Sequence, residues 1–268
     1  MEVATRSVGE YLRDWRRRRR MSQLDLALEA EISARHLSFV ETGRARPSRE
    51  MVLHLCERLD VPLRERNLLL LAAGHAPVFP ARALDDPALG PARRAVDLVL
   101  GGHEPYPALA VDRHWRLVAA NRAVAPLLAG VDEALLTPPV NVLRLSLHVR
   151  GLAPRILNLG EWRAHLLARL SAQIAASGDA ALVALHAELA SYPSPSSARH
   201  AAPDELGGIA VPLRLESPAG PLALISTTTV FGTPIDVTLA ELAIEAFFPA
   251  DDATATRLAD LAVGREPA

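Results

Sequence analysis

Apolar residues recur at helical spacing near the start of the chain. The first set falls at i, i+4 and i+7 and marks one face of a helix predicted over Ser7–Arg20. These residues are Val8, Leu12 and Trp15. Two shorter helices follow, each preceded by a serine that is a favoured N-cap residue, Ser22 or Ser33. Their inward positions are Leu26, Ala27, Ala30, Leu37 and Val40.

The short distance between these two helices predicts a helix-turn-helix over Ser22–Pro47. The second helix of such a pair fits a DNA major groove about 12 Å wide. Ser48 predicts the start of a fourth helix, and Pro62 that of a fifth, at a first-turn position that tolerates proline. The unit is expected to end at Gly74. Residues 1–75 are therefore predicted to form an all-α five-helix domain, followed by a proline-rich linker or wrap-around arm over 76–91.

Beyond this linker the pattern alternates between helix and strand periods. A short helix over Ala92–Leu100 precedes two predicted strands, Ala108–Val111 and Trp115–Ala119. Asn121 is most simply the cap of the next helix. Two helical stripes follow, made of Trp162, Leu166, Leu170 and Ile174, and of Leu182, Leu185 and Leu189.

The C-terminal part predicts an antiparallel sheet. Apolar residues alternate from Ile209 to Leu215, and Ser217–Gly220 predicts a hairpin turn into a return strand over Leu222–Phe231. Val237–Phe248 fits either a helix or a strand. We predict a strand, because two antiparallel strands precede it and Pro249 would stop it. Residues 92–268 are thus predicted to form an α+β domain.

The outward face of the third helix carries residue types that read DNA. Arg35 can donate two hydrogen bonds to a guanine edge, and Ser38 is short enough to approach a base. Ala34 or Phe39 can contact a thymine methyl, and His36 lies at the margin, where it reaches a phosphate. We predict that the segment from Ser33 to Glu41 enters the major groove. A solvated helix face is the alternative.

Positive charge gathers in the same domain. Residues 1–75 contain 14 Arg and 11 Asp or Glu, a net charge of +3, whereas the whole chain has a net charge of -2. This asymmetry is typical of a DNA-binding domain attached to a separate partner domain. Gln23, at a helix start, is predicted to meet a phosphate, and so are Arg44 and Arg46 in the loop after the third helix.

These features together resemble the lambda-repressor-like (Cro/XRE) helix-turn-helix family. The residues that carry the resemblance are Arg16, Gln23, Leu26, Ala27, Ser33, Leu37, Glu41–Gly43 and Arg46–Pro47. The longer stretch Arg35–Gly74 is similar to the MmyB-like subgroup. The resemblance implies an ion pair between Arg16 and Glu41 inside the fold. Glu31 departs from the family, because it occupies a turn position that is often glycine, where a positive φ costs on the order of 1 kcal/mol.

The second domain also carries a resemblance. Residues 107–124, 158–170 and 226–254 are similar to the MmyB-like ligand-binding domain. The resemblance implies a PAS-like fold whose antiparallel sheet and helices enclose a pocket for a fatty-acid-like or other small apolar ligand. The candidate pocket residues are Trp115, Trp162, Leu166 and Phe231. An ordinary filled core is the alternative.

Other chemistry has little support in the sequence. Cys56 is the only cysteine, which excludes disulfide frameworks, and the histidines lack metal-ligand spacing. Ser226–Thr229 lacks a nucleophile elbow, and we interpret Glu241 and Glu245 as structural. We therefore predict no catalytic residue, no metal and no cofactor. There is no apolar run long enough for a membrane span and no apolar signal core, so we expect no membrane association and a cytoplasmic location.

The sequence is thus interpreted as that of a transcription regulator that binds double-stranded operator DNA. A homodimer is expected, because one short helix reads few base pairs and two half-sites multiply specificity. Two alternatives stay open: a repressor whose C-terminal domain only dimerises, and an enzyme domain fused to a DNA-binding head. The operator, the ligand and the sign of regulation are not indicated.

Overall fold

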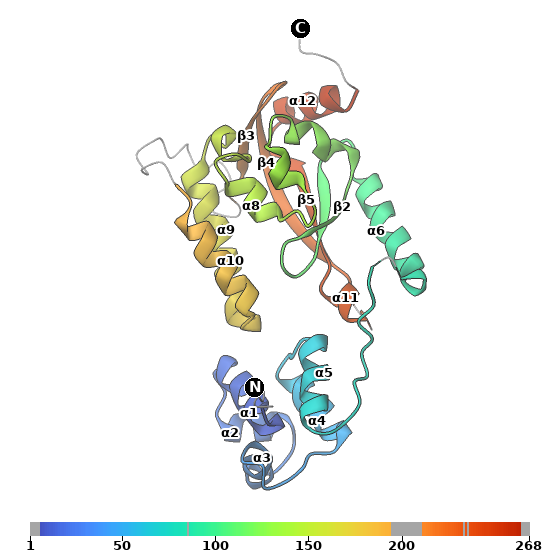
Figure 1. The fold of residues 1–268 in the computed structure, drawn as a ribbon, viewed down its shortest axis with the longest axis vertical. Helices are drawn as coiled ribbons and strands as arrows, with labels where there is room; N and C mark the ends of the chain where they lie inside the picture. The colour runs from blue at the N-terminus through green and yellow to red at the C-terminus, as the bar shows by residue number, and fades with distance from the viewer. Residues whose placement is uncertain (1–5, 85, 194–210, 233, 235, 264–268) are drawn as a thin grey trace. The chain divides into compact units, whose positions relative to one another are not determined.

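The fold is available as a computed structural model that describes residues 6–84, 86–193, 211–232, 234 and 236–263 (Figure 1). The chain divides into two compact units. The first comprises Met1–Ala83 and Thr233–Ala240, and the second comprises Leu84–Gly232 and Glu241–Ala268. The first unit therefore takes a short segment from a distant part of the sequence, which the predicted boundaries did not include.

The first unit contains the five predicted helices, which confirms its all-α class. They are α1 (Val8–Arg18), α2 (Gln23–Glu29), α3 (Ala34–Glu41), α4 (Arg49–Arg58) and α5 (Leu63–Ala72). Ser22, Ser33 and Ser48 each accept a hydrogen bond from a backbone N–H of the first turn, as expected of N-cap residues. The predicted start of the fifth helix needs a small correction. Pro62 is the N-cap of α5 and not its first residue, since the helix begins at Leu63.

Two features fix how α1 and α3 pack. Leu12, Leu26 and Leu37 are fully buried in one core that joins the helices. Gly9 of α1 lies against the end of α3, where an added Cβ would stand 2.5 Å from the backbone oxygen of Glu41. Any side chain at Gly9 would force the two helices apart, so the close approach depends on this glycine.

The chain after α5 folds back onto that helix. The Asn67 Oδ1 atom accepts hydrogen bonds from the backbone N–H groups of Val78 and Phe79, both at 3.1 Å. The Asn67 Nδ2 atom donates to the Phe79 carbonyl at 2.6 Å. The first part of the predicted linker is therefore an arm held by one asparagine.

The segment predicted as a strand from Val237 to Phe248 begins instead with a helical turn, α11 (Val237–Ala240). The Asp236 Oδ1 atom accepts the backbone N–H of Thr238 at 2.9 Å, which favours the turn. Val237 is fully buried, and its N–H donates to the Pro80 carbonyl at 2.8 Å. Arg82 pairs with Asp236 at 3.1 Å. These contacts fasten α11 to the arm after α5.

The second unit is built on a five-stranded antiparallel sheet, which confirms the predicted α+β class. The strands lie in the order β2-β1-β5-β4-β3 and are β1 (Ala108–Val111), β2 (Leu117–Ala120), β3 (Leu213–Ser217), β4 (Gly220–Val230) and β5 (Ala243–Pro249). The last strand lies in the centre, between the first strand and the hairpin of β3 and β4. The predicted strand start at Ile209 lies outside the described residues.

Helices cover both faces of the sheet (Figure 1). They are η1 (Pro87–Leu89), α6 (Gly90–Gly102), η2 (Arg122–Leu128), α7 (Glu133–Leu136), α8 (Val142–Leu147), η3 (Ala153–Arg155), α9 (Leu159–Ser177), α10 (Ala180–Ser191) and α12 (Asp252–Val263). On one face, α8, α9 and α10 enclose the larger core with the inward leucines of β3 and β4. On the other face, Val96 and Leu100 of α6 pack against Ala108, Ala110 and Ile244.

Two predictions near the first two strands need correction, one for a strand start and one for a helix cap. Trp115 is not in a strand: it lies in the turn before β2 with a φ of 63°, an uncommon conformation for a bulky residue. Asn121 precedes η2 but makes no side-chain cap. Its buried amide instead accepts from the N–H of Ala108 and donates to the carbonyls of Leu100 and Tyr106. These backbone groups would otherwise be buried without partners, which explains why the side chain turns away from the helix.

Candidate DNA-binding face and ligand cavity

The α2–α3 pair presents one face inward and one outward. The turn between them passes through Glu31, whose φ is 52°, so the departure from glycine is accommodated in the left-handed region. Leu37 and Val40 are fully buried, whereas Ser33 and Arg35 are exposed. Helical spacing places Leu37 and Val40 on the opposite side of α3 from Arg35, so burying them directs Arg35 to the surface.

The candidate base-reading residues gather on this outward face of α3. The Arg35 guanidinium lies over the ring of Phe39, 5.3 Å from its centroid. Stacking of this kind limits the rotamers of Arg35 and holds its planar fork in one orientation. The other predicted base-reading or groove-margin residues, Ala34, His36 and Ser38, are half-buried. The face therefore offers one fixed cation with small and aromatic groups around it.

Arg44 and Arg46 lie in the loop after α3, and both are exposed. The loop leaves the helix through Gly43, with a φ of 75°, and is pinned where the N–H groups of Arg44 and Ala45 donate to the Phe39 carbonyl. Among the described residues, no carboxylate pairs with Arg35, Arg44 or Arg46. Three unneutralised cations on or beside α3 fit contacts to DNA.

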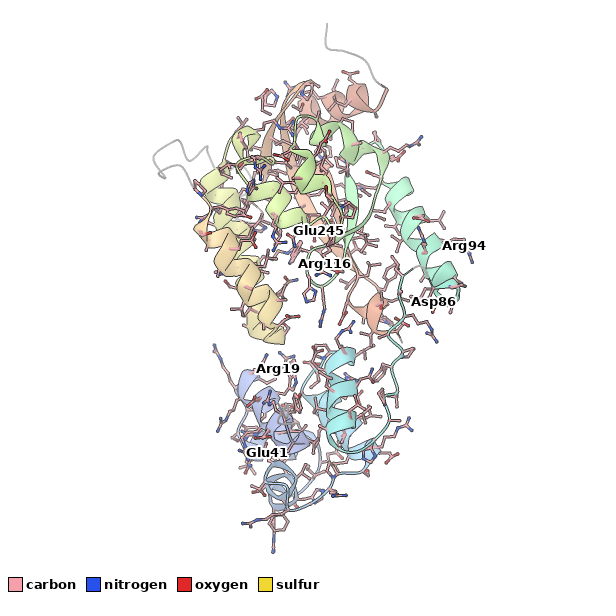
Figure 2. All side chains as sticks on the ribbon, viewed as in Figure 1. Arg19, Glu41, Asp86, Arg94, Arg116 and Glu245 are labelled. Carbon is pink, nitrogen blue, oxygen red and sulfur yellow. The ribbon has the colours of Figure 1, made fainter. Side chains whose placement is uncertain are left out.

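A buried ion pair ties α1 to α3. The Nε and Nη2 atoms of Arg16 donate to the two carboxylate oxygens of Glu41 at 2.7 and 2.9 Å, so the pair implied by the family resemblance is present. The backbone carbonyl of Glu41 accepts from Arg13 at 2.9 Å. In Figure 2, Glu41 is labelled on the helical unit. The pair fixes the end of α3 relative to α1.

Gln23, predicted to meet a phosphate, also contacts this ion pair. The Gln23 Nε2 atom donates to Glu41 at 2.7 Å, so one of its two amide hydrogens is directed into the fold and not at a phosphate. The backbone N–H groups at the start of α2, beside the exposed Ser22, remain placed at a helix N-terminus that favours anions.

The Glu41 carboxylate is ionised more readily than an ordinary glutamate. Burial alone would raise its pKa from the usual 4.5, but hydrogen bonds from Arg16 and Gln23, with the charges of Arg16 and Arg13, lower it overall. Because the folded-state pKa lies below the unfolded one, protonation favours the unfolded chain. The stability that the pair contributes is therefore complete above pH 4.5 and is lost as the pH falls through the folded-state pKa.

We expect calorimetry of the full chain to detect this pH dependence. Between about pH 7 and pH 3, the difference in melting temperature of the first unit between wild type and Glu41→Gln should shrink, because only the wild type loses an ionised group. Other carboxylates titrate in both proteins and cancel in the comparison. A difference that stays constant over this range would contradict the prediction.

The second unit encloses a cavity of about 100 Å³ between the sheet and the helices α8 and α9. Its wall is mostly apolar and includes three of the four predicted pocket residues, Trp115, Trp162 and Leu166. Phe231 does not line it. That residue packs on the opposite face of the sheet, with the core under α6. The space exceeds the roughly 15 Å³ that one water needs.

One end of the cavity is polar. Arg169 of α9 forms a two-point ion pair with Glu245 of β5, with Nη1 to Oε2 at 3.0 Å and Nη2 to Oε1 at 2.5 Å. The Thr228 hydroxyl donates to the same carboxylate at 2.9 Å. The Arg169 guanidinium also lies over the Trp115 ring, 4.6 Å from its centroid. Glu245, on the central strand β5, is labelled in Figure 2.

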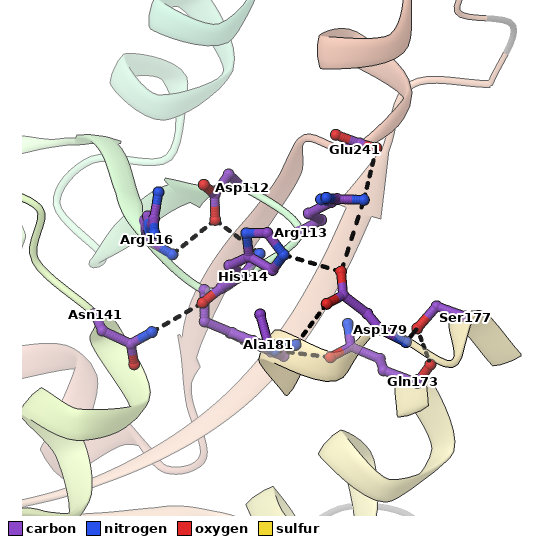
Figure 3. A network of polar contacts seen from close by, with 11 residues as sticks. Asp112, Arg113, His114, Arg116, Asn141, Gln173, Ser177, Asp179, Ala181 and Glu241 are labelled. Carbon is purple, nitrogen blue, oxygen red and sulfur yellow. Dashed lines mark hydrogen bonds and ion pairs between the residues drawn. The ribbon is translucent and has the colours of Figure 1, made fainter. Parts of the chain in front are cut away.

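A polar network holds the turn that carries Trp115 (Figure 3). The indole Nε1 of Trp115 donates to Gln173 of α9 at 2.7 Å. The neighbouring His114 contacts Asp179, between α9 and α10, at 2.9 Å, and Arg113 lies within 3.6 Å of the same carboxylate. Burial would raise the pKa of Asp179, but the His114 hydrogen bond, the backbone N–H of Ala181 and the charges of His114 and Arg113 lower it. These contacts secure Trp115 in its positive-φ conformation.

Arg169 was not singled out by the sequence analysis, and Glu245 was interpreted there as structural without a partner being named. Each had a signal. Arg169 directly precedes Leu170 of the apolar stripe, and Glu245 interrupts an apolar run. Charged residues in such positions are rarely buried unless they are paired. The pairing itself joins positions 76 residues apart, which no local pattern indicates.

Both parts of the chain match known protein families. Residues 92–261 match the model of the MmyB-like transcription regulator ligand binding domain, and residues 7–69 match that of a helix-turn-helix domain. No curated protein matches the chain. Within the described residues, every helix is too short or too polar to traverse a lipid bilayer.

Proposed function

Because the chain belongs to the family of transcription regulators with an MmyB-like ligand-binding domain, we propose that a small, fatty-acid-like apolar ligand in the cavity modulates its binding to operator DNA. DNA binding itself follows from the helix-turn-helix domain and the family. The observation that carries the ligand proposal is the mostly apolar cavity between the sheet and α9. Ligand sites are typically concave and apolar, with a few polar groups.

The DNA-binding part of the proposal assigns roles on and beside α3. Arg35, Ser38 and their neighbours on α3 read base edges, with α3 in the major groove of an operator half-site. Arg44, Arg46 and the N-terminus of α2 contact phosphates and set the register. A homodimer would place two such helices on half-sites about one helical turn apart, roughly 34 Å.

The segment of chain that joins two strands of the cavity wall passes through the first unit. The strands β4 and β5 both contribute cavity residues, Ser226 and Phe247 among them. The connection between these strands contains α11, which packs in the first unit against the arm after α5. A ligand that favours one arrangement of β4 and β5 would thereby bias the position of α11.

The experiment uses an operator selected from a random duplex library with the purified full chain. We expect saturating 1-decanol or decanoic acid to change operator affinity by about fivefold or more, the usual range of allosteric coupling. Leu128→Trp, which adds volume at the cavity wall, should abolish the response while retaining basal DNA affinity.

A matched control is Leu157→Trp, which makes the same substitution at an exposed position outside the cavity wall. This variant should respond to ligand like the wild type. Unchanged operator affinity with every ligand tested, in a protein that binds those ligands, would remove the proposed modulation and leave a regulator whose C-terminal domain only dimerises.

A further inference from the structure

The polar end of the cavity is electrically balanced within the protein. Arg169 is the only cation in the cavity wall described, and Glu245 is the only carboxylate. Nη1 and Nη2 of Arg169 each donate a hydrogen bond to Glu245, and Nη2 also donates to the Thr228 hydroxyl at 2.5 Å. The guanidinium is therefore neutralised before any ligand arrives.

A ligand that carries a carboxylate would meet this pair unfavourably. The ion would leave water for an apolar cavity, which is costly unless it finds a free cation. The available cation is already paired, and the Glu245 carboxylate, whose side chain is 5% exposed, would stand beside the incoming anion. Separating Arg169 from Glu245 would leave that buried carboxylate uncompensated.

A neutral polar group meets no such penalty. A hydroxyl can donate to a Glu245 oxygen and accept from a remaining N–H, because it is both donor and acceptor. Ser226 adds a further hydroxyl to the same wall, whereas Ser146 already accepts from the Trp162 indole at 3.0 Å. The rest of the wall suits an alkyl chain.

We propose, on the basis of the proposed ligand function, that Glu245 selects uncharged ligands, so that the cavity takes an alkyl chain with a neutral polar head, such as an alcohol, in preference to a fatty-acid anion. Glu245 is thus a specificity-determining residue. It acts by occupying Arg169, which would otherwise bind a carboxylate through two hydrogen bonds.

The test compares 1-decanol with decanoate, which share one chain length, by calorimetric titration of the full chain at about pH 8, where the acid is ionised. We expect wild type to bind decanol at least about tenfold more tightly, because juxtaposed like charges are strongly unfavourable. Glu245→Gln keeps the shape but releases the Arg169 charge, and should reverse the preference.

Two further variants separate charge from shape. Arg169→Gln/Glu245→Gln restores a neutral wall and should again prefer decanol. Glu188→Gln makes the same chemical change in a surface pair with Arg144, outside the cavity wall, and should leave the wild-type preference intact. Circular dichroism establishes that each variant is folded.

The outcomes are distinguishable. Equal or tighter binding of decanoate by wild type would overturn the selection by Glu245 and leave the ligand function standing. An unreversed preference in a folded Glu245→Gln variant would also overturn it. Binding of neither compound by wild type would remove the ligand function and the selectivity together.

Discussion

Replacing Arg35, Ser38 and Phe39 together by alanine should weaken binding to the selected operator by about 100-fold or more, since each good base contact contributes roughly 1–3 kcal/mol. Arg35 loses its bidentate donor, and Phe39 no longer supports the orientation of that donor. Affinity for random duplex DNA should fall much less, because the charges of Arg44 and Arg46 remain. Fluorescence anisotropy at one fixed salt concentration measures both affinities.

The matched control for this variant is Arg58→Ala, which removes one exposed arginine from α4. It should lower both affinities slightly and leave their ratio unchanged. Because the three side chains on α3 lie outside the fully buried core, the triple variant should unfold at nearly the wild-type temperature. Full sequence-selective affinity in the triple variant would refute the assignment of α3 as the recognition helix.

Removing Glu41 should have the largest effect on stability. Glu41→Ala leaves the buried Arg16 without its carboxylate and deprives Gln23 of an acceptor, and loss of one partner from a buried pair costs about 3–5 kcal/mol. Calorimetry should show the first unit melting at lower temperature. Hydrogen exchange should accelerate in α1 and α3, which the pair joins.

A double replacement tests whether the loss of stability comes from leaving one buried ion without its partner. Arg16→Met/Glu41→Leu removes both ions and fills their space with apolar groups, so it should recover most of the lost stability. Operator binding by this double variant should follow its stability, since the ion pair lies inside the fold. A Glu41→Ala protein as stable as wild type would contradict the prediction.

Local interactions explain the success of the sequence predictions in the first unit. Ser22, Ser33 and Ser48 cap the helices that follow them because a cap involves only the next three residues. Gly43 ends α3 for a similarly local reason, its positive φ. The strand predicted over Val237–Phe248 was wrong at its start, where α11 forms. The prediction overlooked a local signal, the capping side chain of Asp236.

The candidate sites were predictable to different degrees. The outward residues of α3 follow from the period of its buried residues, so their exposure could be read from the pattern. Of the predicted pocket residues, Trp115, Trp162 and Leu166 lie in the cavity wall and Phe231 lies on the other face of the sheet, because strand order and strand face depend on partners far along the chain. Arg169 was not singled out and Glu245 was interpreted as structural, because their pairing joins positions 76 residues apart.

The sequence by itself determined the helices of the first unit, their caps, the turn at Glu31 and the face that α3 turns outward. It also indicated an antiparallel sheet, since a period of two and a hairpin turn are short-range features. Only the tertiary structure decided that β5 lies at the centre of the sheet, that α11 belongs with the first unit, and that Glu245 neutralises Arg169. Each of these joins residues that are distant along the chain, and such contacts depend on how the whole core packs.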